Sequence, residues 1–563
     1  MTVPRPSALM RAALALAAVA AYGTWAIRDV TSEGITRAHY SSLNVFFHLF
    51  ADFEPVPLAA LGLFAVVSVA LAMRAPSVGD GASSDAPALS QGLTSRATWA
   101  LGAAAMLLAW AIQRWVLHGF PLSMDEFNTG FEATILTHGR LFEPVKEEWI
   151  GFVPAIKPVF VAWRNADHAW YSGYIPVYAA LRALFQLLHA EAWLNPLCAG
   201  GSVVVVASLA RRLRPAEPVA PLVAVLALVT SAQFLVTSGS QYTMPAHLLV
   251  NLVWTWLVLR DDRVSIGAAA LLGGLALGLH NPFPHALFAL PFFWRWLVRK
   301  AYARFVVTTV VYLAFSWIWL GWLRMERGGE PGAGGGLLSL FALPGLAGWR
   351  LSGMNLALVF TWQAPVTAFL LVIAFLREDR LGDTEKDLAR GVLLTFLFYV
   401  LYGSSQGHGW GYRYVHGVLG SIALLAASAA PVVVEALGLR RARALTIVGA
   451  SLALLTVGLR LVQVERFAAP FAEASAYLAA LDADVVVVEA GAVWYGRDLV
   501  RNDAALSRPV IVNGSMLSGQ GWDALRTRYG NQIMLVAADS LKAHGMQRIS
   551  PRERQPAPKS SAP

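Results

Sequence analysis

The sequence predicts an all-α polytopic membrane protein with about 13 transmembrane helices and a small C-terminal α/β domain outside the membrane. Hydrophobic residues make up 56% of the 563 residues and charged residues only 14%. Soluble globular chains carry about 25% charged residues, and one soluble core could not bury so much apolar surface. The apolar residues are also gathered in runs of about 17–20 residues, a length that crosses a bilayer about 30 Å thick.

The apolar runs define the predicted spans, which lie at 8–26, 57–73, 97–117, 194–210, 218–236, 243–259, 264–279, 284–298, 305–323, 356–376, 390–403, 414–434 and 443–461. In the first run, the apolar stretch Ala12–Ala26 follows a short basic start with Arg5 and Arg11. It fits either a signal peptide, with Ala18-Val19-Ala20 as a weak cleavage site, or an uncleaved first helix.

Lys and Arg residues give the spans an orientation. With the N-terminus inside, the inner segments hold basic pairs such as Arg211-Arg212, Arg299-Lys300 and Arg440-Arg441, and the short outer loops are poor in basic residues. This distribution follows the positive-inside rule. It predicts an inner-membrane protein with a cytoplasmic N-terminus and a periplasmic or extracellular C-terminus. The rule also accounts for the net charge of +9, so the partner is the lipid bilayer and no nucleic acid is expected.

One apolar stretch, Tyr171–Leu188, is interpreted differently. If it were a span, the Arg211–Arg214 loop would lie outside and every later loop would be reversed. It also contains Arg182 and Gln186 and follows a polar stretch. We therefore expect an amphipathic helix at the outer membrane surface.

The orientation divides the chain into four parts. We expect N-terminal helices with an inner linker at 1–96, a transmembrane core at 97–463 whose first outer loop covers 118–193, an outer domain at 464–550, and a disordered tail at 551–563. In the outer domain, helix-like and strand-like stretches alternate, which indicates a small α/β fold; they are Ala474–Leu481, Val485–Glu489, Pro509–Asn513, Trp522–Arg528 and Ile533–Ala537.

Two adjacent acids, Asp125 and Glu126, begin the first outer loop directly after a span. Acids close to a membrane surface are functional candidates. A purely structural explanation is also available, since Ser123 followed by Glu126 is a capping-box pattern and Gly139 would end the helix. Glu132 lies seven residues after Asp125, so the two share a helix face, whereas Glu126 is turned away.

The wider context resembles a known family. An Asp-Glu pair opening an outer helix, Gly-Arg-Leu-Phe-Glu-Pro at 139–144 and Tyr174-Ile175-Pro176 are similar to the type C glycosyltransferases that use polyprenyl-phosphate sugars. The nearest branch holds the lipid A aminoarabinose transferases and protein O-mannosyltransferases. The resemblance implies a membrane glycosyltransferase that moves a hexosyl or pentosyl group, with inversion, from a polyprenyl-phosphate donor to a glycan, lipid or protein acceptor at the outer face.

The resemblance also implies roles for particular residues. Asp125 would be the catalytic base and Glu126 would help to position the acceptor or a metal. Cations would bind the donor phosphate, because a guanidinium can hold two phosphate oxygens; these candidates, with one tyrosine, are Arg413, Lys157, His280, His285, His408 and Tyr414. The candidates for acceptor or sugar binding are Glu132, Trp163, Trp170 and Tyr171.

A cofactor is not fixed by the sequence. His280-Asn281-Pro282-Phe283-Pro284-His285 permits a two-histidine metal site, but the prolines alone account for a turn there. The second acidic motif of the family is missing from Gly239-Ser240-Gln241-Tyr242. A divalent cation therefore stays an open possibility.

Two other functions compete with the enzyme. A transporter or flippase for a lipid-linked saccharide would carry charged residues in the middle of its spans and internal repeats. The predicted spans are nearly free of Asp, Glu and Lys at their centres, which favours the enzyme. A non-catalytic protein of envelope-glycan assembly, built on the same scaffold, is the second alternative.

Overall fold

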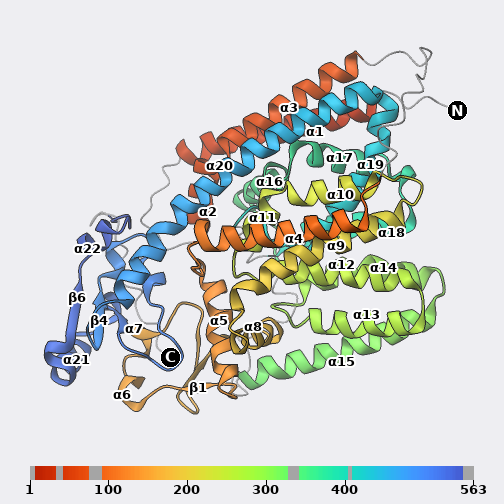
Figure 1. The fold of residues 1–563 in the computed structure, drawn as a ribbon. Coiled ribbons are helices and arrows are strands. Elements are labelled where there is room, and N and C mark those ends of the chain that lie inside the picture. The colour runs from red at the N-terminus through yellow and green to blue at the C-terminus, as the bar shows by residue number, and fades with distance from the viewer. Residues whose placement is uncertain (1–6, 33–41, 75–91, 327–340, 403–408, 550–563) are drawn as a thin grey trace.

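The computed structural model describes residues 7–32, 42–74, 92–326, 341–402 and 409–549 (Figure 1). Each of the 13 predicted spans corresponds to a helix or a pair of helices in it. Among the described residues, seven helices are long and apolar enough to cross a membrane, and two bent pairs raise the number to nine. The other four predicted spans are shorter or more charged helices.

The seven spanning helices, with the short turns that extend some of them left out, are α1 (Ser7–Ser32), α3 (Pro55–Met73), α4 (Ser95–Ala111), α9 (Leu194–Leu213), α15 (Tyr302–Glu326), α19 (Leu419–Leu437) and α20 (Leu439–Ala479). The four others are α12 (Met244–Arg260), α13 (Arg263–Ala276), α14 (Phe283–Val298) and α18 (Asp383–Leu401). A further short helix, α2 (Ser42–Phe53), precedes α3.

Two predicted spans are broken. The span expected at 356–376 is α16 (Leu346–Thr361) followed by α17 (Pro365–Leu376), which meet at an angle of 113°. The prediction of one straight span is wrong here because Pro365 disfavours helical geometry at the residue before it, and Ala364 has an extended ψ of 135°. The other broken span is α10 (Ala220–Val229) and α11 (Ala232–Gly239), bent by 59°.

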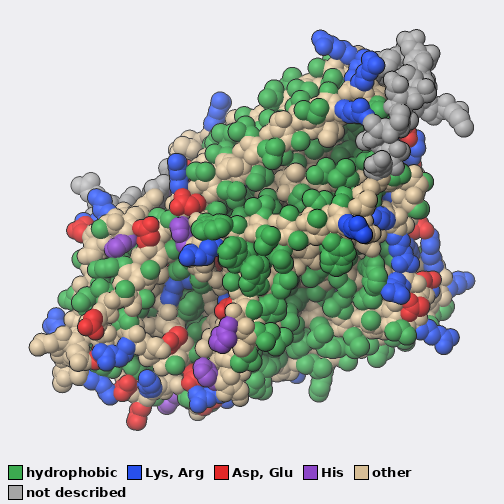
Figure 2. Space-filling view, in the orientation of Figure 1, with side chains coloured by type: hydrophobic (Ala, Val, Ile, Leu, Met, Phe, Trp, Pro, Cys, Tyr) green, Lys and Arg blue, Asp and Glu red, His purple; other side chains and the backbone are tan. Residues whose placement is uncertain are grey.

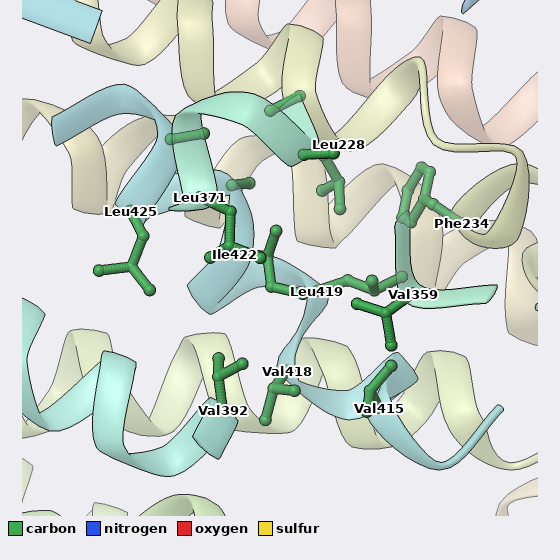
Figure 3. Close-up of a cluster of buried hydrophobic side chains, with 14 of the residues drawn as sticks. Leu228, Phe234, Val359, Leu371, Val392, Val415, Val418, Leu419, Ile422 and Leu425 are labelled. Atoms are coloured by element: carbon green, nitrogen blue, oxygen red, sulfur yellow. The ribbon is translucent and has the colours of Figure 1, made fainter. Parts of the chain in front are cut away.

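The centre of the molecule is an apolar core around α19. The buried side chains come from α19 and from α10, α11, α16, α17 and α18, and Leu419 and Ile422 lie in the middle of the cluster (Figure 3). Val415 and Val418, in the turn before α19, belong to the same core. The core therefore holds the segment that begins at Arg413.

The surface of one face agrees with a membrane position. Hydrophobic side chains form a broad band over the long helices, Lys and Arg gather at one end of the band, and mixed charges cover the other end (Figure 2). A continuous exposed apolar surface of this kind faces lipid rather than water. The chain is thus a multi-pass membrane protein.

The first loop folds into short elements. They are α5 (Met124–Thr137), β1 (Glu143–Pro144), α6 (Glu147–Ile150), α7 (Val153–Ile156), β2 (Ala162–Arg164), β3 (Ala169–Tyr171) and α8 (Val177–Leu187), with the strands in the antiparallel order β1-β3-β2. Helix α8 has 11 residues, too few to cross a bilayer. It packs on α5 and leaves Leu184 and Leu187 exposed, as an interfacial helix does.

The C-terminal segment contains a three-stranded parallel sheet with the order β5-β4-β6. Its elements are β4 (Val485–Val488), β5 (Val510–Asn513), α21 (Gly519–Tyr529), β6 (Ile533–Val536) and α22 (Ala538–Ala543). The sheet does not stand apart from the first loop, because Val485 and Val512 share one hydrophobic core with Phe131, Trp149 and Trp170. The long helix α20 continues from the membrane region into this unit (Figure 1).

Candidate functional site

The start of α5 is fixed by the capping box that the sequence predicts. The hydroxyl of Ser123 accepts a hydrogen bond from the backbone N–H of Glu126, and the carboxylate of Glu126 accepts one from the N–H of Ser123, both at 3.2 Å. Two backbone donors at the helix start are thereby satisfied. The cap holds the first turn of α5, and with it Asp125, in one orientation.

Asp125 lies at the meeting point of three chain segments. One carboxylate oxygen accepts a hydrogen bond of 2.5 Å from the Tyr174 hydroxyl, and the other accepts one of 2.7 Å from the guanidinium of Arg413. The ring of His280 packs against Tyr174 with centroids 4.4 Å apart. Residues up to 288 positions apart in the sequence thus surround one carboxylate.

The position of Arg413 depends on the loop before it. Gly411 has a φ of +75°, a conformation that favours glycine, and a Cβ there would lie 2.9 Å from the side chain of Gln233. The amide of Gln233 donates a hydrogen bond of 2.8 Å to the carbonyl of Tyr412. Gln233 is on α11, just after the break in its span, so the broken helix supports the arginine loop.

A cavity of about 280 Å³ opens beside these groups. It is lined by Asp125, Tyr174, Thr243, Met244, His247, His280, Asn281, Phe283, Pro284, Tyr399, Tyr402, Arg413, Tyr414 and Gly417. Tyr399 and Tyr414 stack at 4.2 Å on one side of it. The cavity combines one carboxylate, one guanidinium and imidazoles with aromatic walls, which suits a polar headgroup joined to an apolar chain.

The electrostatics keep Asp125 ionised. Burial of the carboxylate acts to raise its pKa, but the charge of Arg413, a smaller effect of His280 in its protonated form and the hydrogen bond from Tyr174 outweigh burial and hold the pKa of Asp125 at about 2. Burial lowers the pKa of His280, against the opposing effect of Asp125. A negative carboxylate and a neutral imidazole therefore face the cavity at neutral pH.

The two other acids of α5 point elsewhere. The carboxylate of Glu126 is buried and accepts hydrogen bonds from the backbone N–H groups of Ser123 and Gln241, at 3.2 and 2.8 Å, outside the cavity. Burial raises its pKa to about 7, against the effect of these bonds. Glu132 is fully buried and binds the N–H of Ser172 at 3.0 Å, and burial raises its pKa to about 7 as well.

The other first-loop candidates do not line the cavity either. Lys157 is half-buried and donates a hydrogen bond of 2.5 Å to the carbonyl of Val161. Its pKa is lowered by burial and then by the nearby Arg497. Trp163 is half-buried and stacks on His168.

Trp170 and Tyr171 are buried in the fold. Trp170 has no exposed surface, and its indole N–H donates to the carbonyl of Ala504 at 3.0 Å. Tyr171 is 5% exposed and packs edge-on against Phe142. The expectation that these rings stack on a sugar is therefore corrected: the hydrophobic core between the first loop and the C-terminal sheet takes Trp170.

The three predicted histidines have different positions. Of the two that lie within the described residues, only His280 lines the cavity. His285 is fully buried, and its ring nitrogens lie 2.7 Å from the side-chain oxygen Oδ1 of Asn251 and 2.6 Å from the Tyr312 hydroxyl, so it joins α12, α14 and α15. His408 lies outside the described residues. Within the described ranges, no group of three or more His, Cys, Asp or Glu side chains is placed to hold a metal ion.

The sequence analysis did not select some of the residues that line the cavity. His247 stands in the first turn of α12, and both of its ring nitrogens are buried without a hydrogen-bond partner among the described residues. Tyr399 and Tyr402 end α18. The sequence did contain a signal for His247, since a histidine near the start of an otherwise apolar span is unusual. A single residue in a predicted span does not reveal, however, which face of the helix turns toward the cavity.

Comparisons with known proteins support the fold. No protein-family model matches the sequence, and no curated protein sequence matches it. Among solved structures, ArnT from Cupriavidus metallidurans bound to undecaprenyl phosphate is similar with a TM-score of 0.50 and 14% identity over 79% of this chain and 90% of that chain. The apo state of the same protein gives 0.51 and 14% over 81% and 99%.

This similarity defines the class of fold. The chain has the type C glycosyltransferase fold that the resemblance implied, over most of its length. The protein whose crystal structures share it, ArnT, was solved with undecaprenyl phosphate bound.

Proposed function

We propose that this protein is a membrane glycosyltransferase that moves a sugar from a polyprenyl-phosphate donor to an acceptor. The observation that carries the proposal is the ionised Asp125 beside Arg413 and His280 at one cavity. The fold is shared with ArnT, a protein solved with undecaprenyl phosphate bound. The fold and the cavity chemistry support the same reaction independently.

The donor phosphate would bind at Arg413 and His280. The guanidinium of Arg413 offers two parallel donors to phosphate oxygens, and a neutral His280 can donate one ring N–H. Tyr399 and Tyr414 would cover the phosphate and the first part of the apolar lipid chain. Lys157, outside the cavity, would act only if the first loop moved, so we give it no role in this geometry.

Asp125 would take the proton of the acceptor hydroxyl as that oxygen attacks the anomeric carbon. The bond to the lipid phosphate breaks, and the phosphate leaves with its charge held by Arg413. Arg413 is paired with Asp125. When the guanidinium turns to the phosphate, the carboxylate loses part of this stabilisation, and its pKa rises toward that of a useful base.

The proposal also covers the stereochemistry of transfer, the roles of the two other acids and the location in the cell. A single displacement by one base predicts inversion at the anomeric carbon, for a hexosyl or pentosyl group alike. Glu126 and Glu132 would act as positioning residues rather than as catalytic ones. The distribution of Lys and Arg supports an inner-membrane location, with Asp125 and the C-terminal sheet on the outer side.

The experiment is transfer from a panel of polyprenyl-phosphate sugars by purified protein, wild type against Asp125→Asn. We expect kcat to fall at least about 10²-fold, because a general base contributes about 10²–10⁴. Asp167→Asn is the matched control: Asp167 pairs with Arg164 at 2.7 Å in the same loop, away from the cavity, and its loss should leave kcat unchanged. Full activity of Asp125→Asn would contradict the proposal. Transport of the intact donor across the membrane without ATP and without sugar transfer would favour a flippase.

A further inference from the structure

A second cavity lies on the other side of the start of α5. It has a volume of about 470 Å³ and lies between the end of α4 and the end of α8. Gln241 lines it, and two residues further on Thr243 lines the cavity of Asp125. Since Gln241 also donates its backbone N–H to Glu126, the first turn of α5 forms part of the partition between the two cavities.

The wall that α4 contributes to this second cavity contains an irregular helical turn. The helix ends in a π-helical turn, Ile112–Val116, and such turns are frequent at functional sites. Gln113 and Arg114 lie in this turn and both line the cavity. Gln113 is only 8% exposed, yet its carbonyl oxygen Oε1 has no hydrogen-bond partner among the described residues. Buried amide oxygens are normally paired, so this oxygen is available to a ligand.

The opposite wall is ordered by an ion pair. Arg182, buried in α8, binds Glu191, whose second oxygen accepts a hydrogen bond of 3.3 Å from Gln186. Arg182 also donates to the side chain of Gln241 at 2.6 Å. These bonds hold Glu191 and Gln186 at the cavity surface, so the polar groups are fixed in place before any ligand binds.

The lining points to hydroxyl groups rather than to a simple anion. Arg114 is exposed and has no ion-pair partner within the described part of the chain, but the carboxylate of Glu191 lies in the same cavity and would repel a phosphate. Amides, one guanidinium and one carboxylate offer both donors and acceptors, which is what sugar hydroxyls require. Trp110, stacked on Trp193 at 5.5 Å, adds an indole to the lining.

The rim of the cavity faces lipid. Leu107 and Leu108 on α4 and Leu184 and Leu187 on α8 are all more than 40% exposed beside it. Trp115 is 64% exposed and packs edge-on against Trp110, as in the aromatic belts of membrane interfaces. A ligand whose polar part entered the cavity could keep an apolar chain in the bilayer.

We propose that this second cavity binds the saccharide headgroup of a membrane glycolipid, with Gln113 and Arg114 as its principal contacts. The proposal does not depend on the transfer chemistry. A glycolipid is among the acceptor classes expected for the enzyme, and one bound here would lie next to the start of α5; only this last step rests on the proposed function.

The test uses the full-length protein in nanodiscs and three photoreactive probes with the same diazirine-bearing alkyl chain. Their headgroups are glucoside, tetraethylene glycol and phosphate. We expect the glucoside to label peptides from 106–119 and 184–193, as mapped by mass spectrometry, at least fivefold more than the glycol. Gln113→Ala and Arg114→Ala should each lower this labelling at least fivefold. Arg263→Ala, which removes an exposed arginine at the start of α13, should not.

Three results would overturn the proposal. Equal labelling by the glycol probe would mean an apolar groove, stronger labelling by the phosphate probe would mean an anion site, and labelling unchanged in both cavity variants would mean a different location. Asp125→Asn should be labelled like the wild type. The binding result therefore stays interpretable if the catalytic proposal fails.

Discussion

Asp125 and Arg413 were both selected from the sequence, and the structure pairs them at 2.7 Å. Asp125 could be found because acids close to apolar spans are uncommon, and Arg413 could be found because the family resemblance implies a phosphate-binding cation there. It could not separate His280, which faces the cavity, from His285, which is buried between helices. That difference depends on which face each helix turns toward the cavity, and this orientation cannot be predicted from a single sequence.

Tyr174 should lower the pKa of the proposed catalytic base, Asp125. Its hydroxyl donates to the carboxylate of Asp125, and this bond lowers the pKa of that group. In Tyr174→Phe the charged form loses a donor, so the pKa rises and the acidic limb of the kcat/KM–pH profile moves to higher pH. We expect kcat/KM near neutral pH to fall less than tenfold. An acidic limb that stayed in place or moved to lower pH would contradict this role.

The helices were easier to predict than their bends. The capping box and the glycine after α5 gave its start and end, since both depend on local chemistry. The break between α16 and α17 was missed because a proline within an apolar run looks like a tolerated kink, and the break between α10 and α11 was missed because Thr230-Ser231 is only a short polar interruption of an apolar run. These breaks matter, since Gln233, just after one of them, supports the loop of Arg413.

The cap of α5 should affect catalysis more than stability. Ser123→Ala removes the side-chain acceptor at the helix start, a loss of about 1 kcal/mol, and frees the turn that carries Asp125. Ser518→Ala is the matched control, because Ser518 caps α21 in the same way, accepting from Gly521 at 3.0 Å. Both variants should melt at slightly lower temperature. Only Ser123→Ala should lose kcat, and equal activities would argue against positioning by the cap.

For the whole molecule, the main surprise is that the C-terminal sheet and the first loop share a core. The strands of the sheet were expected from strand-like stretches that alternate with helix-like ones, and β4, β5 and β6 lie where those stretches are. Their packing against Trp149 and Trp170, more than 300 residues earlier, involves no local signal. The sequence therefore suggested two separate outer units where the structure has one.

Trp170→Ala should test this shared core. The indole is fully buried and bound to the carbonyl of Ala504, so its removal should lower the free energy of unfolding by about 3–5 kcal/mol. Thermal denaturation and protease sensitivity of the C-terminal segment would report the loss. The half-buried Trp163 is the control, and Trp163→Ala should cost clearly less. Equal effects would mean that the two parts are not joined through Trp170.

The predicted orientation can be tested by labelling. The chain has one cysteine, Cys198, which is buried, so Cys198→Ala gives a cysteine-free background. In intact cells, a membrane-impermeant maleimide should react with Asp167→Cys in the first loop and reach Glu217→Cys, between α9 and α10, only after permeabilisation. Labelling of Glu217→Cys from outside would reverse the topology and would mean that α8 crosses the membrane.

The continuous helix α20 has a mechanical consequence. Its 41 residues, at a rise of 1.5 Å each, make a rod about 60 Å long that begins at the basic cluster Arg440-Arg441 and ends just before the C-terminal sheet. A tilt of about 5° at one end would displace the other by roughly 5 Å. Transmembrane helices tilt to match bilayer thickness, so the thickness of the membrane bears on how closely the sheet rests on α5, the helix that carries Asp125.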